Sequence, residues 1–284
     1  MKHNLLLLAG LLVLSVSRVL AQDAANTVRE TPAAKTSSLT LAAIYGNNAN
    51  YYGQTAEERL PYLLTNASYR LVNGVYFSAS GYQLLTNSQA TFEEVDLSAG
   101  YDVDLATGLI GSVGYTRSFF AKNSPLLQAA NENTLSASVT YDWKLLKSSL
   151  SSFYAFGKTS DVFLTLNNSK SMDLGSLFSD KDYISFEPGF EIASGTVQYL
   201  EEYIVRRENQ IQIPGAPRVP EYTTRTRSAS TFDMLSYSAN FLLGYNRSHY
   251  LIETGYQLSY LGSHISTTNR KPRSFFNLSL YYQF

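Results

Sequence analysis

Large apolar and polar residues alternate along most of the chain after Ser38, and the alternation is most regular at residues 94–105. The odd positions there are apolar or aromatic: Val95, Leu97, Ala99, Tyr101, Val103 and Leu105. The even positions are polar or glycine: Glu94, Asp96, Ser98, Gly100, Asp102 and Asp104. Successive side chains of a strand point to opposite faces, so this period of two predicts a β-strand with one apolar face.

The same pattern predicts twelve strands, at 38–46, 62–71, 74–85, 91–104, 109–120, 134–145, 149–166, 182–193, 196–206, 234–245, 249–261 and 273–284. Short turns are predicted at 72–73, 106–108, 146–148, 194–195 and 246–248, and Asn73-Gly74 is a strong hairpin signal. Longer connections are predicted at 47–61, 86–90, 121–133, 167–181, 207–233 and 262–272. Short turns at one end and long loops at the other are typical of transmembrane β-barrels.

Three places fit this assignment badly. Pro188 cannot donate to a ladder and predicts a bulge or break in its strand. The strand at 149–166 changes character at Gly157-Lys158-Thr159, and the strand at 196–206 carries adjacent glutamates, Glu201 and Glu202. Ten or fourteen strands are therefore alternatives to twelve.

The last strand ends the chain on an aromatic residue. Its even positions are large and apolar (Phe276, Leu278, Leu280, Tyr282 and Phe284), whereas Asn277, Ser279 and Gln283 are polar. This segment resembles the closing strand of Gram-negative outer-membrane β-barrel proteins. The resemblance implies an all-β, antiparallel, up-and-down transmembrane barrel in contact with outer-membrane lipid. It also implies that the assembly machinery recognises these five residues, and that both ends of an even-stranded barrel lie in the periplasm.

The beginning of the chain predicts export. Lys2 precedes an uncharged apolar run at 5–16, and Val19-Leu20-Ala21 offers a cleavage site before Gln22. We expect a signal peptide at 1–21, a flexible periplasmic lead at 22–37 and the barrel at 38–284. The signal peptide and the barrel together predict that the protein lies in the cell outer membrane.

Composition narrows the function. Removing Lys2 and Arg18 from the 22 basic residues leaves 20 against 23 acidic ones, a net charge of −3 that predicts no nucleic-acid partner. Cysteine is absent, so no disulfide forms, and neither a cofactor nor a metal-ligand cluster is predicted. The 22 tyrosines favour strands and membrane interfaces; Tyr69, Tyr101, Tyr141, Trp143, Tyr245, Tyr250, Tyr282 and Phe284 all fall near predicted short turns.

If the apolar face meets lipid, the polar face lines the lumen. Its charged members are Arg70, Glu94, Asp96, Asp102, Asp142, Lys144, Glu187, Glu191 and Glu253. One interpretation is a passive, porin-like pore whose net acidic lining favours cations or cationic, hydroxyl-rich small solutes. The other is that these groups pair across a sealed lumen, which makes the protein a structural or interaction barrel that displays its loops.

The segment 207–233 is the longest predicted loop and is rich in arginine and proline. It could fold into the lumen as a constriction, bind lipopolysaccharide phosphates, or remain a mobile surface loop.

A third class is a hydrolase, and a soluble secreted β-protein is the remaining alternative. His264-Ile265-Ser266, with Asn269 beyond, faintly resembles the His-x-Ser arrangement of outer-membrane phospholipases. The match covers only a few residues of a Ser/Thr-rich loop, so no catalytic residue is predicted. Asp173, Asp180 and Asp182 lack the spacing of a calcium loop and are interpreted as solvated charge.

Overall fold

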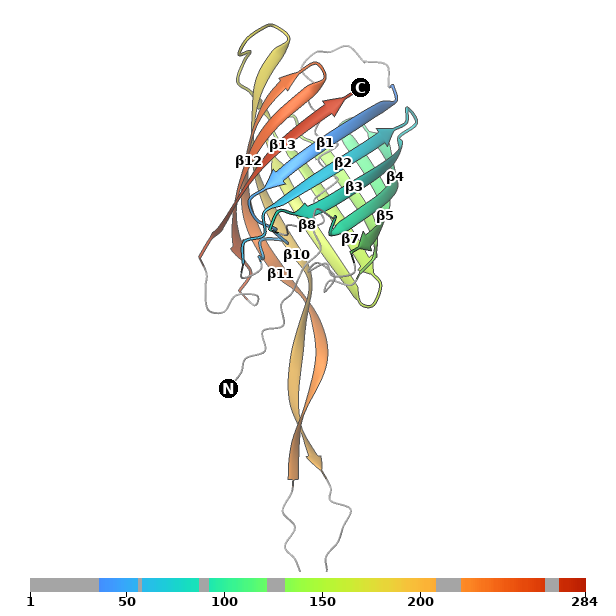
Figure 1. Cartoon of the computed structure of the whole chain (residues 1–284), viewed down its shortest axis with the longest axis vertical. Helices are drawn as coiled ribbons and strands as arrows, with labels where there is room; N and C mark the ends of the chain where they lie inside the picture. Colours follow the sequence, from blue (N-terminus) through green and yellow to red (C-terminus); the bar gives the residue numbers. More distant parts are fainter. Residues whose placement is uncertain (1–35, 56–57, 87–91, 122–130, 208–220, 264–270) are drawn as a thin grey trace, which may run out of the picture.

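The computed structural model describes residues 36–55, 58–86, 92–121, 131–207, 221–263 and 271–284. It consists of antiparallel strands wound into one barrel (Figure 1). The strands are β1 (Ser38–Gly46), β2 (Tyr62–Arg70), β3 (Val75–Leu84), β4 (Glu94–Ala106), β5 (Leu109–Phe120), β6 (Asn133–Asp142), β7 (Lys147–Phe156), β8 (Ser160–Ser169), β9 (Met172–Asp173), β10 (Asp182–Arg207), β11 (Glu221–Arg247), β12 (Tyr250–Leu261) and β13 (Arg273–Gln283).

Twelve of these strands form a closed ring, which confirms the predicted fold and strand count. Each strand pairs with its neighbour, β13 pairs with β1, and β10 joins β8 to β11. The two-residue β9 adds to the edge of β10. Among the described residues no helix is long and apolar enough to cross a membrane.

The two faces of the wall differ as the alternation predicts. On the outer face Phe77, Leu97 and Val113 expose 52 %, 50 % and 55 % of their surface. On the inner face small polar side chains such as Ser68 and Ser259 are buried. An apolar exterior around a polar interior reverses the order of a soluble protein and is the arrangement of a transmembrane barrel.

The strand count is right, but two boundaries are wrong in ways that offset each other. The predicted strand 149–166 is two strands, β7 and β8, joined by a turn in which the Gly157 N–H donates to the Thr159 carbonyl at 2.9 Å. The predicted strands 182–193 and 196–206 are one strand, β10. The turn predicted at Ser194-Gly195 does not exist, and a β-bulge stands there instead.

This reassignment changes which connections lie at which end. The terminal end, where β1 begins and β13 stops, also holds the turns at 71–74, 107–108, 143–146 and 248–249 and the segment 170–181. The opposite, loop end holds the connections at 47–61, 85–93, 121–132, 157–159 and 262–272. The predicted long loop 167–181 therefore lies on the terminal side, and the short turn 157–159 lies among the loops.

The predicted loop 207–233 is also wrong, because residues 221–233 are part of β11. Pairing with β8 stops at Gly195 and pairing with β12 begins at Ser236, so beyond them β10 and β11 pair only with each other. This ribbon runs to the pair Arg207–Glu221, about 40 Å at ~3.3 Å per residue. Figure 1 shows it leaving the barrel at the loop end. The tip, 208–220, lies outside the described residues.

The difficulties at Pro188 and at the paired glutamates are explained by this geometry. Pro188 lies where the partner of β10 changes from β8 to β9, so the break falls in the neighbouring strand and β10 continues. Glu201 and Glu202 lie in the ribbon, beyond the wall of the barrel.

The revised topology can be tested by cysteine labelling, because the native chain has no cysteine. Lys158→Cys stands at the loop end and Lys181→Cys at the terminal end, both at exposed positions. We expect a membrane-impermeant maleimide to label Lys158→Cys on intact cells, and Lys181→Cys only after the outer membrane is permeabilised. Lys271→Cys, in another exposed loop-end position, is the positive control. Labelling of Lys181→Cys and protection of Lys158→Cys on intact cells would contradict the topology.

Candidate channel interior

The closed register decides which side chains face the interior, because directly opposed residues share a face of the sheet. Every predicted charged residue that lies on a strand falls on the inner face: Arg70, Glu94, Asp96, Asp102, Asp142, Glu187, Glu191 and Glu253. The same register adds Asp104, Lys147, Asp161 and Arg273, which were not among the predicted lining residues. Carboxylates therefore outnumber basic groups on the described inner face.

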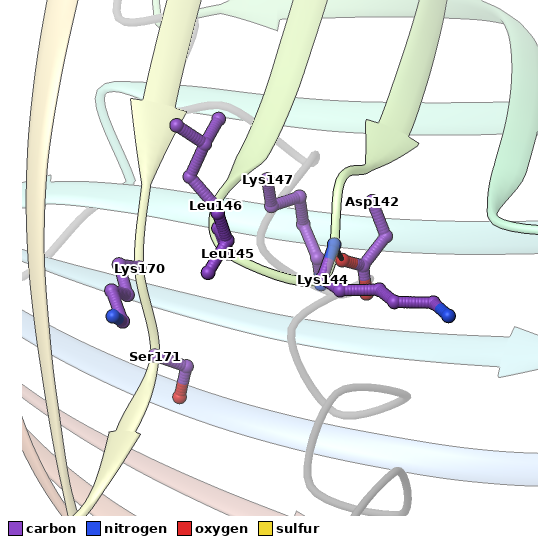
Figure 2. A pocket seen from close by; sticks show the side chains of 7 residues that line it. All are labelled: Asp142, Lys144, Leu145, Leu146, Lys147, Lys170 and Ser171. Carbon is purple, nitrogen blue, oxygen red and sulfur yellow. Dashed lines mark hydrogen bonds between the residues drawn. The ribbon is translucent and has the colours of Figure 1, made fainter.

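Lys144 is placed differently. It lies in the β6–β7 turn rather than on a strand, in the left-handed region at φ 68°. Its backbone N–H donates to Asp142 Oδ1 at 2.7 Å, which stabilises the turn. Together with Lys147 and Lys170 it borders a hollow of about 100 Å³ at the terminal end (Figure 2).

The inner-face charges do not form a single site. Towards the terminal end the Arg70 guanidinium pairs with the Asp102 carboxylate and lies 5.5 Å from the centre of the Tyr76 ring. Towards the loop end Glu94 lies buried beside Asp96 on β4, opposite Tyr82 and near Ser118. The two groups are separated along the barrel.

The connection at 47–61 folds into the interior at the loop end. A tight turn at its tip pairs Tyr51 with Gln54, and Tyr52 and Gly53 both have positive φ. The Asn50 side-chain amide donates to Gln257 Oε1 on β12 at 2.8 Å. Just after the tip, Thr55 Oγ1 accepts a hydrogen bond from the Arg273 guanidinium of β13 at 3.1 Å. These contacts hold the tip against the inner face of β12 and β13.

Gly53 shows how closely the tip approaches the wall. A Cβ atom at Gly53 would lie 3.0 Å from the Ser236 Cβ and 3.2 Å from the Ser259 Cβ. The positive φ of 82° and this lack of space both require glycine at the position.

An aromatic cluster anchors the tip to β8, which lies on the same part of the wall as β10 to β13. Tyr52 stacks on Phe163 of β8 with ring centres 5.1 Å apart, and Tyr51 meets the same ring edge-on at 5.4 Å. Phe163 lies in an apolar cluster with Ala193 and Leu235, which are almost fully buried. Burying a large apolar side chain contributes about 2 kcal/mol, so these rings are a substantial anchor.

A second apolar cluster anchors the base of the connection. Ala49 and Leu60 pack against Tyr62 and Tyr82 of the β2–β3 wall. The Ala49 N–H donates to the Leu60 carbonyl at 2.8 Å, which joins the two arms of the connection. The connection therefore extends across the interior from β2–β3 to β8, β10 and β11.

Both tyrosines at the tip are affected by this burial. Desolvation, with contributions from Tyr52 and Asp161, raises the pKa of Tyr51 well above its usual value. Desolvation, with a contribution from Glu191, also raises the pKa of Tyr52, and the Tyr52 hydroxyl has no hydrogen-bond partner. Ionisation of either ring is thus opposed by its surroundings.

Tyr51 and Tyr52 are functional candidates that the sequence analysis did not identify. The only signal was a pair of aromatic residues before a glycine in an otherwise polar connection. The segment considered as a constriction, 207–233, is instead directed away from the barrel in its described part.

The other candidates add no site among the described residues. His264, Ser266 and Asn269 lie outside them. His249 stacks on Tyr282 beside the β11–β12 turn. Asp182 accepts backbone N–H groups of Leu177 and Phe178, so its carboxylate stabilises its own segment. The described residues contain no group of three or more His, Cys, Asp or Glu side chains that could hold a metal ion.

The five apolar residues of the terminal strand lie on the outer face of β13 and at its end: Phe276, Leu278, Leu280, Tyr282 and Phe284. The Phe284 N–H donates to the Leu39 carbonyl at 2.9 Å, and its ring meets Tyr282 edge-on. The last residue therefore takes part in closing the barrel.

No protein-family model matches the chain, and no curated protein sequence matches it. Among solved structures it is similar to the KdgM porin, at 10% identity over 87% of this chain and 99% of that one, with a TM-score of 0.48. The NanC porin aligns at 10% identity over 86% and 98%, with a TM-score of 0.44. A COG4313 outer membrane channel from Pseudomonas putida F1 aligns at 9% identity over 89% and 97%, with a TM-score of 0.41. At these identities the similarity concerns the barrel architecture alone.

Proposed function

We propose that the protein is a passive outer-membrane channel for small solutes, with a preference for cations or for cationic, hydroxyl-rich molecules. The observation that carries this proposal is the excess of carboxylates on the inner face of a closed barrel. Fixed charge of one sign inside a narrow, low-dielectric wall raises the local concentration of ions of the opposite sign.

The charge also argues against one class of cargo. One similar structure is the KdgM porin in complex with disordered oligogalacturonate, which is a polyanion. A polyanion would be repelled by the inner-face carboxylates of this chain, such as Glu187 and Glu191. The solutes proposed for this chain are therefore cationic, opposite in charge to oligogalacturonate.

The inward connection at 47–61 supplies the constriction in this proposal. Because it is anchored on both sides, by Tyr52 against Phe163 and by Leu60 against Tyr62, it narrows the passage at the loop end. Solutes then pass close to Glu191 and Asp161, which lie near the two tyrosines.

The alternative is a non-transporting barrel that presents its loops to a partner. Two observations favour it: the connection at 47–61 occupies the interior, and the β10–β11 ribbon extends far beyond the wall. A barrel of this kind would show no conductance even after the inward connection is removed, which separates it from a channel.

The proposed location is the outer membrane, reached through a cleaved signal peptide at 1–21. We propose that the terminal end faces the periplasm and that the apolar outer face meets lipid. We also propose that the assembly machinery recognises β13 through its apolar face.

The first test is charge selectivity in planar bilayers. Wild-type protein should conduct and favour cations in a salt gradient. The variant Glu187→Gln/Glu191→Gln removes two negative charges from the inner face. Each lost charge changes the energy of a cation about 8 Å away in water by ~0.5 kcal/mol, which changes the local cation concentration roughly twofold. The cation-to-anion permeability ratio should fall accordingly. Glu132→Gln/Asp180→Asn, with the same charge change at exposed positions off the inner face, should match the wild type. Lack of conductance in every variant would reject the channel.

The second test uses pH to release the inward connection. The raised pKa values of Tyr51 and Tyr52 mean that their buried, neutral forms stabilise the connection fully below pH 10. That stability is lost as the pH rises through the raised values. Wild-type conductance should therefore increase reversibly above pH 10. Tyr51→Phe/Tyr52→Phe keeps the rings but cannot ionise, so its conductance should stay constant. An equal alkaline increase in both proteins would contradict the proposed role of the two tyrosines.

The third test concerns assembly. Removal of Phe284 deletes an outward aromatic ring and the backbone bond to Leu39, so the amount of folded protein in the outer membrane should fall several-fold. Gln283→Ala, a change on the inner face of the same strand, is the control and should assemble normally. The measurement is the folded fraction in isolated outer membranes. Equal assembly of both variants would reject recognition through the terminal aromatic.

A further inference from the structure

Two acidic side chains lie beside each other on the inner face of β4, towards the loop end. Glu94 and Asp96 are two positions apart on one strand, so both point to the interior. Glu94 exposes only 3 % of its surface. The two carboxylates lie within hydrogen-bonding distance of each other and of the Ser118 hydroxyl on β5. Two buried carboxylates in contact cannot both stay ionised without a counter-charge, so the pair needs either a shared proton or a cation.

The described part of the barrel supplies no basic side chain to this pair. Arg117 precedes Ser118 on β5, but its guanidinium donates to Glu132 Oε2 at 2.6 Å. Arg70 is paired with Asp102, nearer the terminal end. Among the described residues, therefore, no arginine or lysine neutralises the two carboxylates.

The oxygen atoms that lack a partner distinguish a metal cation from a shared proton. Glu94 Oε1 and Asp96 Oδ1 are buried and accept no hydrogen bond. The Tyr82 hydroxyl is a third oxygen of this kind, on a side chain that is 3 % exposed. Tyr82 lies directly opposite Glu94 on β3 and interacts electrostatically with its carboxylate. One shared proton joins only two oxygens and leaves others unsatisfied, whereas a cation coordinates several oxygens at once.

We propose that Glu94, Asp96, Ser118 and Tyr82 form a calcium-binding site inside the barrel, towards the loop end. All of these ligands are oxygen atoms, which favours a hard cation over a transition metal. Water completes the shell of about six to eight oxygens that Ca²⁺ takes. Mg²⁺ requires a near-ideal octahedron, which side chains held at the fixed spacing of three strands do not readily supply.

Bound Ca²⁺ would join β4 to its two neighbours, because Tyr82 belongs to β3 and Ser118 to β5. It would also neutralise this pair, which leaves the proposed cation preference to other inner-face carboxylates such as Glu187 and Glu191. Calcium binding does not require conduction. The inference therefore holds or fails separately from the proposed channel.

The experiment uses terbium, a luminescent substitute for Ca²⁺ that is excited through a nearby tyrosine ring. Full-length mature protein in detergent is freed of metal with EDTA, and its folding is checked by circular dichroism. Excitation of tyrosine should give terbium emission that added Ca²⁺ removes by competition. Glu94→Gln/Asp96→Asn preserves side-chain size but removes both charges, so Ca²⁺ affinity should fall on the order of a hundredfold. Tyr82→Phe should lower the emission at saturating terbium while both carboxylates remain.

A matched control is Glu58→Gln/Asp180→Asn, which makes the same charge change at exposed positions and should bind Ca²⁺ as the wild type does. Equal Ca²⁺ affinity in the wild type and in Glu94→Gln/Asp96→Asn would overturn the proposal. Unchanged emission from Tyr82→Phe would place the ion elsewhere and would also overturn it. If folded wild-type protein bound no Ca²⁺, the proposal would fail and a shared proton would explain how the pair is neutralised.

Discussion

Closure of the backbone hydrogen-bond network is the constraint on which the rest of the structure depends. In a bilayer, each unpaired N–H or C=O costs several kcal/mol because lipid offers no partner, so only a sheet without edges is stable there. Here β13 closes on β1, and β10 passes between β8 and β11. The last residue shares in this closure through the Phe284–Leu39 bond. Once the ring is closed, its register fixes the facing of every strand residue.

The register decides which side chains point outward and which point inward, and the consequences differ between the two faces of the wall. Outside, a repeated apolar face is sufficient, so sequence alternation alone specifies it. Inside, the same alternation places the carboxylates of Glu94, Asp96, Glu187 and Glu191 on the face that lines the interior. The connection at 47–61 occupies part of that interior, with its two tyrosines against Phe163. The interior is thus shaped by a connection as well as by the strands.

The sequence predicted the fold, the strand count and the faces because each rests on a local period of two. The pattern did not reveal the turn at Gly157, because even-numbered residues face outward in both β7 and β8. A three-residue turn between them leaves the alternation of apolar and polar positions uninterrupted. Ser194-Gly195 resembled a turn, yet a Cβ at Gly195 would lie 2.3 Å from Phe163 Cδ1. That glycine serves close packing. The inward tyrosines could not be predicted, because their partners lie far away in the sequence.

The charges along the barrel axis follow from the same architecture. Carboxylates such as Glu94, Asp161 and Glu191 lie near or within the half that the inward connection reaches, whereas three lysines gather at the terminal rim. A pore that selects cations needs its acidic groups where the passage is narrow, because field strength rises as the low-dielectric walls approach each other. Lysines at the terminal rim scarcely affect that selection, because their charge is screened over a Debye length of about 8 Å. The proposed cation preference therefore depends on the carboxylates near the inward connection and not on the lysines at the terminal rim.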